Sequence, residues 1–163
     1  MLWVTNMFLK INEIFAHCDI PCKIYDPVLA QIGVLTVIRL TDLILELKSS
    51  PDSLKNRHQI SRLIYEKESQ GNIVKEEVRV IWGDYFKEKQ IQLFPEVHDL
   101  VHLIMQDVSR CKQELSRTNG ESLLEKVNHF ANIYWSCKEV KTRLKIAPYP
   151  PGLPILMPEL SNA

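Results

Sequence analysis

The sequence predicts an all-α fold, in the form of an antiparallel four-helix bundle. Four segments repeat apolar residues at helical spacing, short links rich in turn residues separate them, and alternating strand patterns are nearly absent. Long helices joined by short links pack as antiparallel neighbours. With 163 residues, the chain is long enough for one domain with a core of its own.

The first predicted helix covers residues 28–47 and is apolar on most of its faces. Asp26 supplies an N-cap, and Pro27 suits the first position of a helix. Arg39, Asp42 and Glu46 interrupt the apolar run, which favours a buried helix over a membrane span. We therefore expect this segment to be the most buried helix.

Turn residues mark the starts of the other three helices. The second begins near Ser53 and continues through the weak point at Gly71-Asn72, and the third opens at Phe94-Pro95-Glu96. The residues Thr118-Asn119-Gly120 predict a turn, after which Ser122 caps the fourth helix.

The C-terminal residues 145–163 predict a proline-rich arm outside the bundle. Prolines occur at 148, 150, 151, 154 and 158, and proline interrupts both helices and sheet ladders. We expect an extended arm or a disordered tail, whose apolar residues could dock on a neighbouring subunit; these residues are Ile155, Leu156 and Met157.

Composition excludes some classes of partner. Lys plus Arg equals Asp plus Glu at 20 each, so the formal net charge is zero and no broad nucleic-acid or membrane surface is expected. Four cysteines are too few for a disulfide scaffold, which favours a reducing, cytoplasmic setting. Cys111 and Cys137 stand singly on predicted helices, and we expect them to be small buried residues. His98 and His102 are one helical turn apart, and a hydrogen-bonded surface is favoured there over a metal site.

The segment HCDIPCKIYDP, residues 17–27, concentrates metal donors. His17, Cys18 and Cys22 offer an imidazole and two thiolates, but no second pair of ligands completes a usual zinc site. Cleavage before His17 would add its α-amine and the Cys18 amide, making a planar set of two nitrogens and two sulfurs with an axial imidazole. Such a set suits Ni(II) or Cu(II). A loop with incidental thiols is the alternative.

The leader, residues 1–16, lacks the basic start of a secretory signal. Composition alone leaves two interpretations of it, a removable pro-segment and an ordinary frayed N-terminus.

Four blocks of the chain resemble the nickel-containing superoxide dismutase family. HCDIPCKIYDP resembles the family's nickel hook, and three later blocks follow in the family's order: IWGDYFK at 81–87, FPEVHDLV at 94–101 and IYW at 133–135. The resemblance covers residues 17–144, and leaves the leader and the proline arm outside.

The resemblance implies a nickel enzyme that converts superoxide to oxygen and hydrogen peroxide, assembled as a homohexamer. Residues 1–16 then become a propeptide that a maturation protease removes. His17 provides the amine and the axial imidazole, Cys18 the amide and a thiolate, and Cys22 the second thiolate. Tyr25 and Tyr85 match tyrosines that restrict access to the metal, and Asp19 matches an aspartate that orders the hook.

Three positions depart from the family's pattern. Lys23 stands where the family has a hook glycine, which could serve a left-handed backbone; alternatively, its ammonium could attract the superoxide anion. Gly33 and Gln70 stand where the family has a glutamate and an arginine that help to hold the axial imidazole. Loss of such outer partners often costs about 10- to 100-fold in metal affinity or activity.

Two other functions stay open from the residues alone. The chain could be a helical oligomer that stores or senses nickel or copper without turnover. It could also be a thiol redox protein in which Cys18 and Cys22 form a disulfide.

Overall fold

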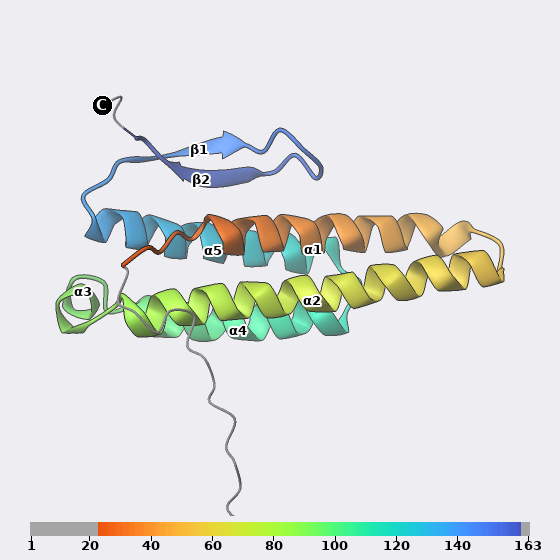
Figure 1. Ribbon diagram of the computed structural model, residues 1–163, viewed down its shortest axis with the longest axis horizontal. Helices are drawn as coiled ribbons and strands as arrows, with labels where there is room; N and C mark the ends of the chain where they lie inside the picture. Colours follow the sequence, from red (N-terminus) through yellow and green to blue (C-terminus); the bar gives the residue numbers. More distant parts are fainter. Residues whose placement is uncertain (1–22, 161–163) are drawn as a thin grey trace, which may run out of the picture.

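The computed structural model describes residues 23–160, and the candidate ligands His17, Cys18 and Cys22, with Asp19, lie outside this range. Within it, four long helices run lengthwise side by side, each antiparallel to the neighbours that it packs against (Figure 1). They are α1 (Val28–Glu46), α2 (Leu54–Asp84), α4 (Val97–Gln113) and α5 (Arg117–Cys137). Two short helices occupy links, η1 (Leu47–Ser49) after α1 and α3 (Glu88–Leu93) before α4. The predicted antiparallel four-helix bundle is confirmed.

Helix α1 has more buried residues than α2, α4 or α5, as its composition predicts. It packs against both α2 and α5, and ten of its residues are buried. The Val28 amide donates to Asp26 Oδ1 at 2.9 Å, which confirms Asp26 as a cap at its start. By length and composition this helix could cross a membrane, but 56% of its most apolar window is buried inside the bundle, and this packing accounts for its hydropathy.

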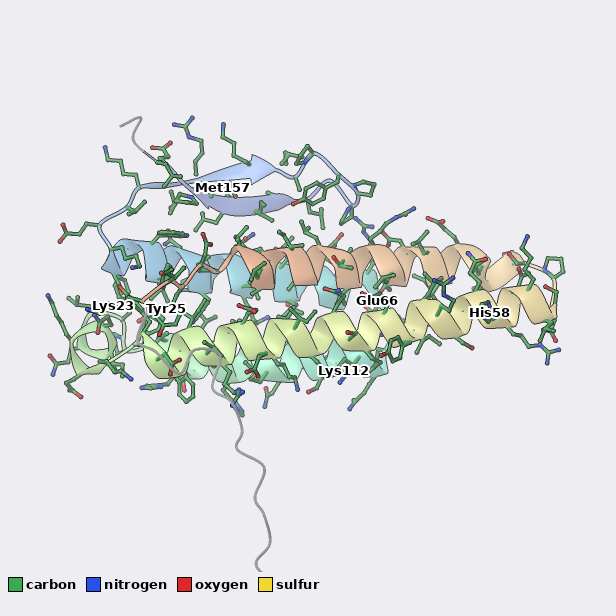
Figure 2. The ribbon with its side chains drawn as sticks, viewed as in Figure 1. Lys23, Tyr25, His58, Glu66, Lys112 and Met157 are labelled. Atoms are coloured by element: carbon green, nitrogen blue, oxygen red, sulfur yellow. The ribbon has the colours of Figure 1, made fainter. Side chains whose placement is uncertain are left out.

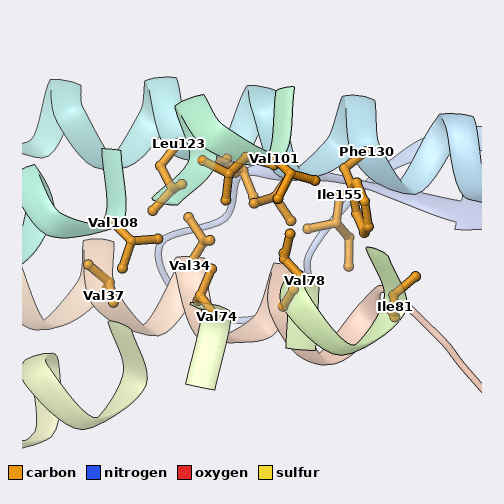
Figure 3. Packing of buried hydrophobic residues seen from close by; sticks show 14 of the residues in the cluster. Val34, Val37, Val74, Val78, Ile81, Val101, Val108, Leu123, Phe130 and Ile155 are labelled. Atoms are coloured by element: carbon orange, nitrogen blue, oxygen red, sulfur yellow. The ribbon is translucent and has the colours of Figure 1, made fainter. Parts of the chain in front are cut away.

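The core lies where the four helices face one another. Figure 3 shows valines of α1, α2 and α4 converging on Leu123 and Phe130 of α5. These side chains are almost completely removed from solvent, and burial of each aliphatic side chain contributes about 1.5–3 kcal/mol. Apolar burial therefore holds the bundle together.

Helix α2 continues without a break through the weak point at Gly71. A Cβ added at Gly71 would lie 3.0 Å from Cγ of Lys112 on α4. Glycine thus permits the close approach of α4 to α2, and tertiary packing offsets its low helix propensity. The prediction of a single long helix is confirmed.

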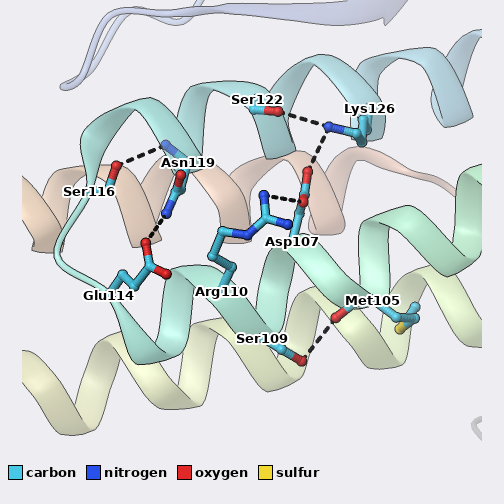
Figure 4. A network of polar contacts seen from close by, with 9 residues as sticks. All are labelled: Met105, Asp107, Ser109, Arg110, Glu114, Ser116, Asn119, Ser122 and Lys126. Carbon is cyan, nitrogen blue, oxygen red and sulfur yellow. Dashed lines mark hydrogen bonds and ion pairs between the residues drawn. The ribbon is translucent and has the colours of Figure 1, made fainter.

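Helix α5 begins earlier than the sequence predicts. Ser116, not Ser122, is the N-cap, and its hydroxyl accepts from the Asn119 amide at 3.3 Å (Figure 4). The predicted turn at 118–120 is wrong because Gly120 is a packing residue inside the helix. A Cβ at Gly120 would lie only 2.5 Å from Cγ1 of Ile38 on α1.

A buried carboxylate joins α4 to α5. Asp107 is 4% exposed, and its Oδ2 accepts from Lys126 Nζ at 2.6 Å while Oδ1 lies 3.2 Å from Arg110 NH1 (Figure 4). The two cations offset the cost of removing this carboxylate from water.

The proline-rich arm is a β-hairpin, so the prediction that proline excludes a sheet there is wrong. Strand β1 (Thr142–Ile146) pairs antiparallel with β2 (Pro154–Pro158), and the hairpin lies along α1 and α5 (Figure 1). The expected arm boundary at residue 145 falls inside β1. Ile155 is 5% exposed and belongs to the chain's own core, so it is not free to dock on a neighbouring subunit.

The register explains why the prolines are tolerated. The ladder continues at both ends of the strands, with the Ala147 amide donating to the Leu153 carbonyl and the Glu159 amide to the Lys141 carbonyl. In this alternation Pro154 and Pro158 fall at positions whose N–H would point away from β1. Proline is confined to such edge positions because it has no N–H to donate. Gly152 supplies the positive φ of 70° that the connecting turn requires.

Candidate metal centre

The described part of the candidate centre is an aromatic cluster at one end of the bundle. Tyr25 precedes α1 and Tyr85 follows α2, and their ring centroids lie 6.4 Å apart at an angle of 58°. The structure therefore brings together the two predicted access residues, although 60 positions separate them in the sequence. Figure 2 shows Lys23 and Tyr25 at this end of the bundle, where the described part of the chain begins.

Tyr134 of α5 links the two halves of the cluster, a role that sequence reasoning missed. Its hydroxyl donates to the Tyr25 carbonyl at 2.5 Å, and its ring lies 4.8 Å from the Tyr85 ring. Edge-to-face pairs of this kind add about 0.5–1.5 kcal/mol beyond their area burial. The signal that could have found it is the IYW block at 133–135, one of the blocks that carry the family resemblance.

Lys138, just beyond α5, brings a positive charge to the cluster. Its Nζ lies 5.0 Å from the Tyr85 ring centroid and 5.2 Å from that of Tyr134. An ammonium within about 6 Å of an aromatic face is attracted by the ring quadrupole. No motif in the sequence singles out this lysine, because the contact depends on where α5 ends relative to α2.

Burial keeps the cluster's hydroxyls protonated. It raises the pKa of Tyr85, with a smaller contribution from the nearby Cys137, and it raises the pKa of Tyr134 well above its usual range. The charged form of a phenol is disfavoured when water is excluded. Both tyrosines therefore present O–H groups, not phenolates, at neutral pH.

The position where the family has a glycine is left-handed in this chain. Lys23 has a φ of 60°, which costs a residue with a side chain about 1–2 kcal/mol relative to glycine's freedom. The expectation of a left-handed backbone at this position is confirmed. Local strain is thus tolerated two residues before Tyr25.

We expect Lys23→Gly to raise the free energy of unfolding by up to about 1 kcal/mol, because glycine adopts positive φ without a steric penalty. Urea denaturation measures this change. The adjacent substitution Ile24→Gly, at a side chain that is 78% exposed, should not stabilise the chain. A lower free energy of unfolding in Lys23→Gly than in the unsubstituted chain would contradict the conclusion that the backbone of Lys23 is strained.

Gly33 and Gln70 lie next to each other across the contact of α1 and α2. A Cβ at Gly33 would lie 2.8 Å from Cγ2 of Val74 and 3.9 Å from Oε1 of Gln70. A larger residue at 33 would force Val74 to move, so the close packing of these helices requires glycine. The Gln70 amide donates instead to Glu66 Oε1 on its own helix at 2.8 Å.

The surface histidines are hydrogen-bonded, as favoured from their spacing. Trp82 Nε1 donates to His98 Nδ1 at 2.9 Å, and His102 Nε2 lies 2.9 Å from the Gln106 amide nitrogen. Among residues 23–160 no group of three His, Cys, Asp or Glu side chains could hold a metal ion. Cys111 is a buried free thiol whose pKa burial raises to about 11, and Cys137 is a half-buried one.

The donors of the hook therefore remain the candidate ligands. Two thiolates and an imidazole suit a borderline, late first-row ion, and hard oxygen donors are few in that segment. The residues present thus fit nickel. Lys23 and Tyr25 connect this segment directly to the aromatic cluster.

Comparisons with known proteins agree with this chemistry. The family model "Nickel-containing superoxide dismutase" matches residues 12–138. The superoxide dismutases [Ni] of Streptomyces seoulensis and Streptomyces coelicolor are 29% and 28% identical over 136 residues, covering 83% of this chain and 98% of each relative.

Solved structures show the same bundle. A native nickel superoxide dismutase structure at 1.30 Å is 29% identical with a TM-score of 0.66, covering 75% of this chain and 99% of that one. A structure whose nickel ligation corresponds to the oxidised state has a TM-score of 0.65 at 28% identity, covering 76% and 99%. The family model spans most of the described bundle as well as the hook. The chain belongs to the nickel-containing superoxide dismutase family.

Proposed function

We propose that the chain disproportionates superoxide at a nickel site made by residues 17–22 after removal of residues 1–16. The observation that carries the proposal is the joining of this donor-rich segment to the Tyr25–Tyr85–Tyr134 cluster in a chain of this family. His17 provides the terminal amine and imidazole, Cys18 the amide and a thiolate, and Cys22 the second thiolate. Nickel, when bound, supplies the alternation between two oxidation states.

The described residues account for access and substrate attraction. Tyr25 and Tyr85 restrict the approach to the hook, and their apolar rings exclude bulk water. The Lys23 ammonium and the Lys138 ammonium lie at the same end of the bundle, where they raise the local concentration of an anion. Asp19 orders the hook.

Maturation and assembly complete the proposal. A maturation protease cuts between Ala16 and His17, the product assembles as a homohexamer, and it works in the cytoplasm. The free thiols of Cys111 and Cys137 support a reducing compartment. Family membership supports turnover over the alternative of nickel or copper storage, and a metal bound by both hook thiols would exclude a Cys18–Cys22 disulfide.

We expect nickel-loaded protein that begins at His17 to consume superoxide at least about tenfold faster than the full chain, because a peptide bond at Ala16 removes the amine from the ligand set. Pulse radiolysis measures the rates, and mass determination verifies each N-terminus. A chain extended by a single alanine before His17 is the matched control and should be as slow as the full chain. Equal rates in all three proteins would contradict the role of the amine.

A further inference from the structure

The C-terminal hairpin packs against α1 and α5. Ala147 and Ile155 are 3% and 5% exposed and belong to the same core cluster as the helix side chains (Figure 3). The match with the family model ends at residue 138, before β1 begins at Thr142. The hairpin is thus an addition to the matched bundle that shares its core.

Two side-chain amides bind the edge of β2 that faces the helices. Gln31 of α1, which is 1% exposed, donates from Nε2 to the Leu156 carbonyl at 3.0 Å and to Asn128 Oδ1 at 2.8 Å. Asn128 of α5 accepts from the Leu156 amide at 3.1 Å and donates to the Pro154 carbonyl at 3.0 Å. The hairpin, α1 and α5 therefore share one satisfied polar network.

This network lies at the start of α1. Gln31 belongs to the first turns of α1, only six residues after Tyr25. The chain before α1 is fixed to α5 by the Tyr134 hydroxyl on the Tyr25 carbonyl, and α1 itself is fixed to α5 and β2 through Gln31. Both attachments hold the start of α1, and the Gln31 bond to the Leu156 carbonyl depends on the hairpin.

We propose that the hairpin is a clamp that positions the start of α1, and with it Tyr25 and the hook, against Tyr85 and Tyr134. Gln31 and Asn128 are its positioning residues. The buried amides define one register of β2 on α1, because any slip would leave polar groups of both unsatisfied. That the position of the hook matters for turnover rests on the proposed function; the clamp itself does not.

The test uses Gln31→Leu in nickel-loaded protein beginning at His17, since leucine fills a similar volume but donates no hydrogen bond. We expect amides of residues 28–34 and 155–157 to exchange with deuterium about tenfold faster, while those of α2 and α4 keep their protection. The electron paramagnetic resonance line of oxidised nickel should broaden or split. The kcat should fall about tenfold at unchanged nickel content, as for other outer supports of a metal ligand.

Thr142→Ala is the matched control, because its hydroxyl joins the hairpin to Asn132 of α5 at 3.1 Å without touching α1. It should leave exchange, the nickel line and kcat unchanged. Asn128→Ala opens the same network from α5, and should reproduce the Gln31→Leu pattern if that variant does not fold.

Exchange that rises uniformly over the whole bundle, or not at all, would overturn the clamp. Faster amide exchange confined to the start of α1 and β2 in Gln31→Leu, together with no superoxide consumption by the unsubstituted protein, would support the clamp and contradict the proposed function. If the unsubstituted protein consumes superoxide but amide protection is unchanged in both Gln31→Leu and Asn128→Ala, the proposed function stands and the clamp is contradicted.

Discussion

Replacement of Cys22 by serine should lower superoxide consumption by at least about a hundredfold, more than the loss of an outer support of a metal ligand typically costs. The proposed planar set contains two thiolates, which stabilise the higher oxidation state by donating electron density. A serine hydroxyl stays protonated near neutral pH and is a poor donor for nickel. Pulse radiolysis with metal analysis measures the loss. Circular dichroism should stay unchanged, because the bundle from residue 23 onward has a core of its own.

Cys111→Ala is the matched control for the loss of a thiol. Cys111 is 3% exposed on α4, with its pKa raised to about 11 by burial, so it is neither a thiolate at neutral pH nor part of the hook. We expect this variant to keep its activity, with a modest loss of stability from the smaller side chain. Retained activity in Cys22→Ser would instead favour a metal site without that sulfur.

Replacement of Lys67 by methionine should reduce the free energy of unfolding by about 2–3 kcal/mol and the melting temperature by roughly 5–10 °C. Lys67 is 2% exposed, and burial lowers its pKa. Its Nζ donates to the carbonyls of Cys111, Lys112 and Glu114 at 2.5, 3.0 and 3.3 Å. The last carbonyls of a helix have no partner within the helix, so the lysine of α2 completes the C-terminus of α4.

Lys75→Met tests whether the position matters or only the charge. Lys75 also lies on α2 and also contacts α4, donating to Ser109 Oγ at 2.7 Å, but it is only half-buried. Its hydroxyl partner also donates to the Met105 carbonyl at 3.0 Å, so it keeps a hydrogen bond. Thermal unfolding should show a loss below about 1 kcal/mol. Equal losses in the two variants would contradict capping by Lys67.

Local sequence signals predicted the helical fold and the donors of the hook. The apolar composition of 28–47 predicted a buried helix, because a helix that is apolar on most of its faces must remove those faces from water. His17, Cys18 and Cys22 lie within six residues of one another, so the residues alone predict that their side chains could bind one metal ion. Lys23 was open to two interpretations; its φ of 60° confirms the left-handed backbone, and attraction of the superoxide anion by its ammonium stays a prediction.

Predictions were wrong where the role of a residue depends on a partner far away in the sequence. Gly120 looks like a turn residue, but it serves the approach of Ile38 from α1, and Ser116 caps the helix. The prolines of the C-terminal arm look incompatible with a sheet until the register with β1 places Pro154 and Pro158 at non-pairing positions.

The sequence by itself determined the helices and their amphipathic faces and predicts the candidate ligand types, because these depend on spacing within a few residues. Only the tertiary structure decided that Tyr25, Tyr85 and Tyr134 meet, and that Gln31 and Asn128 hold the hairpin. These contacts join residues dozens to a hundred positions apart. Their existence depends on how the four helices align, and burial of the whole core sets that alignment, not the preference of any one segment.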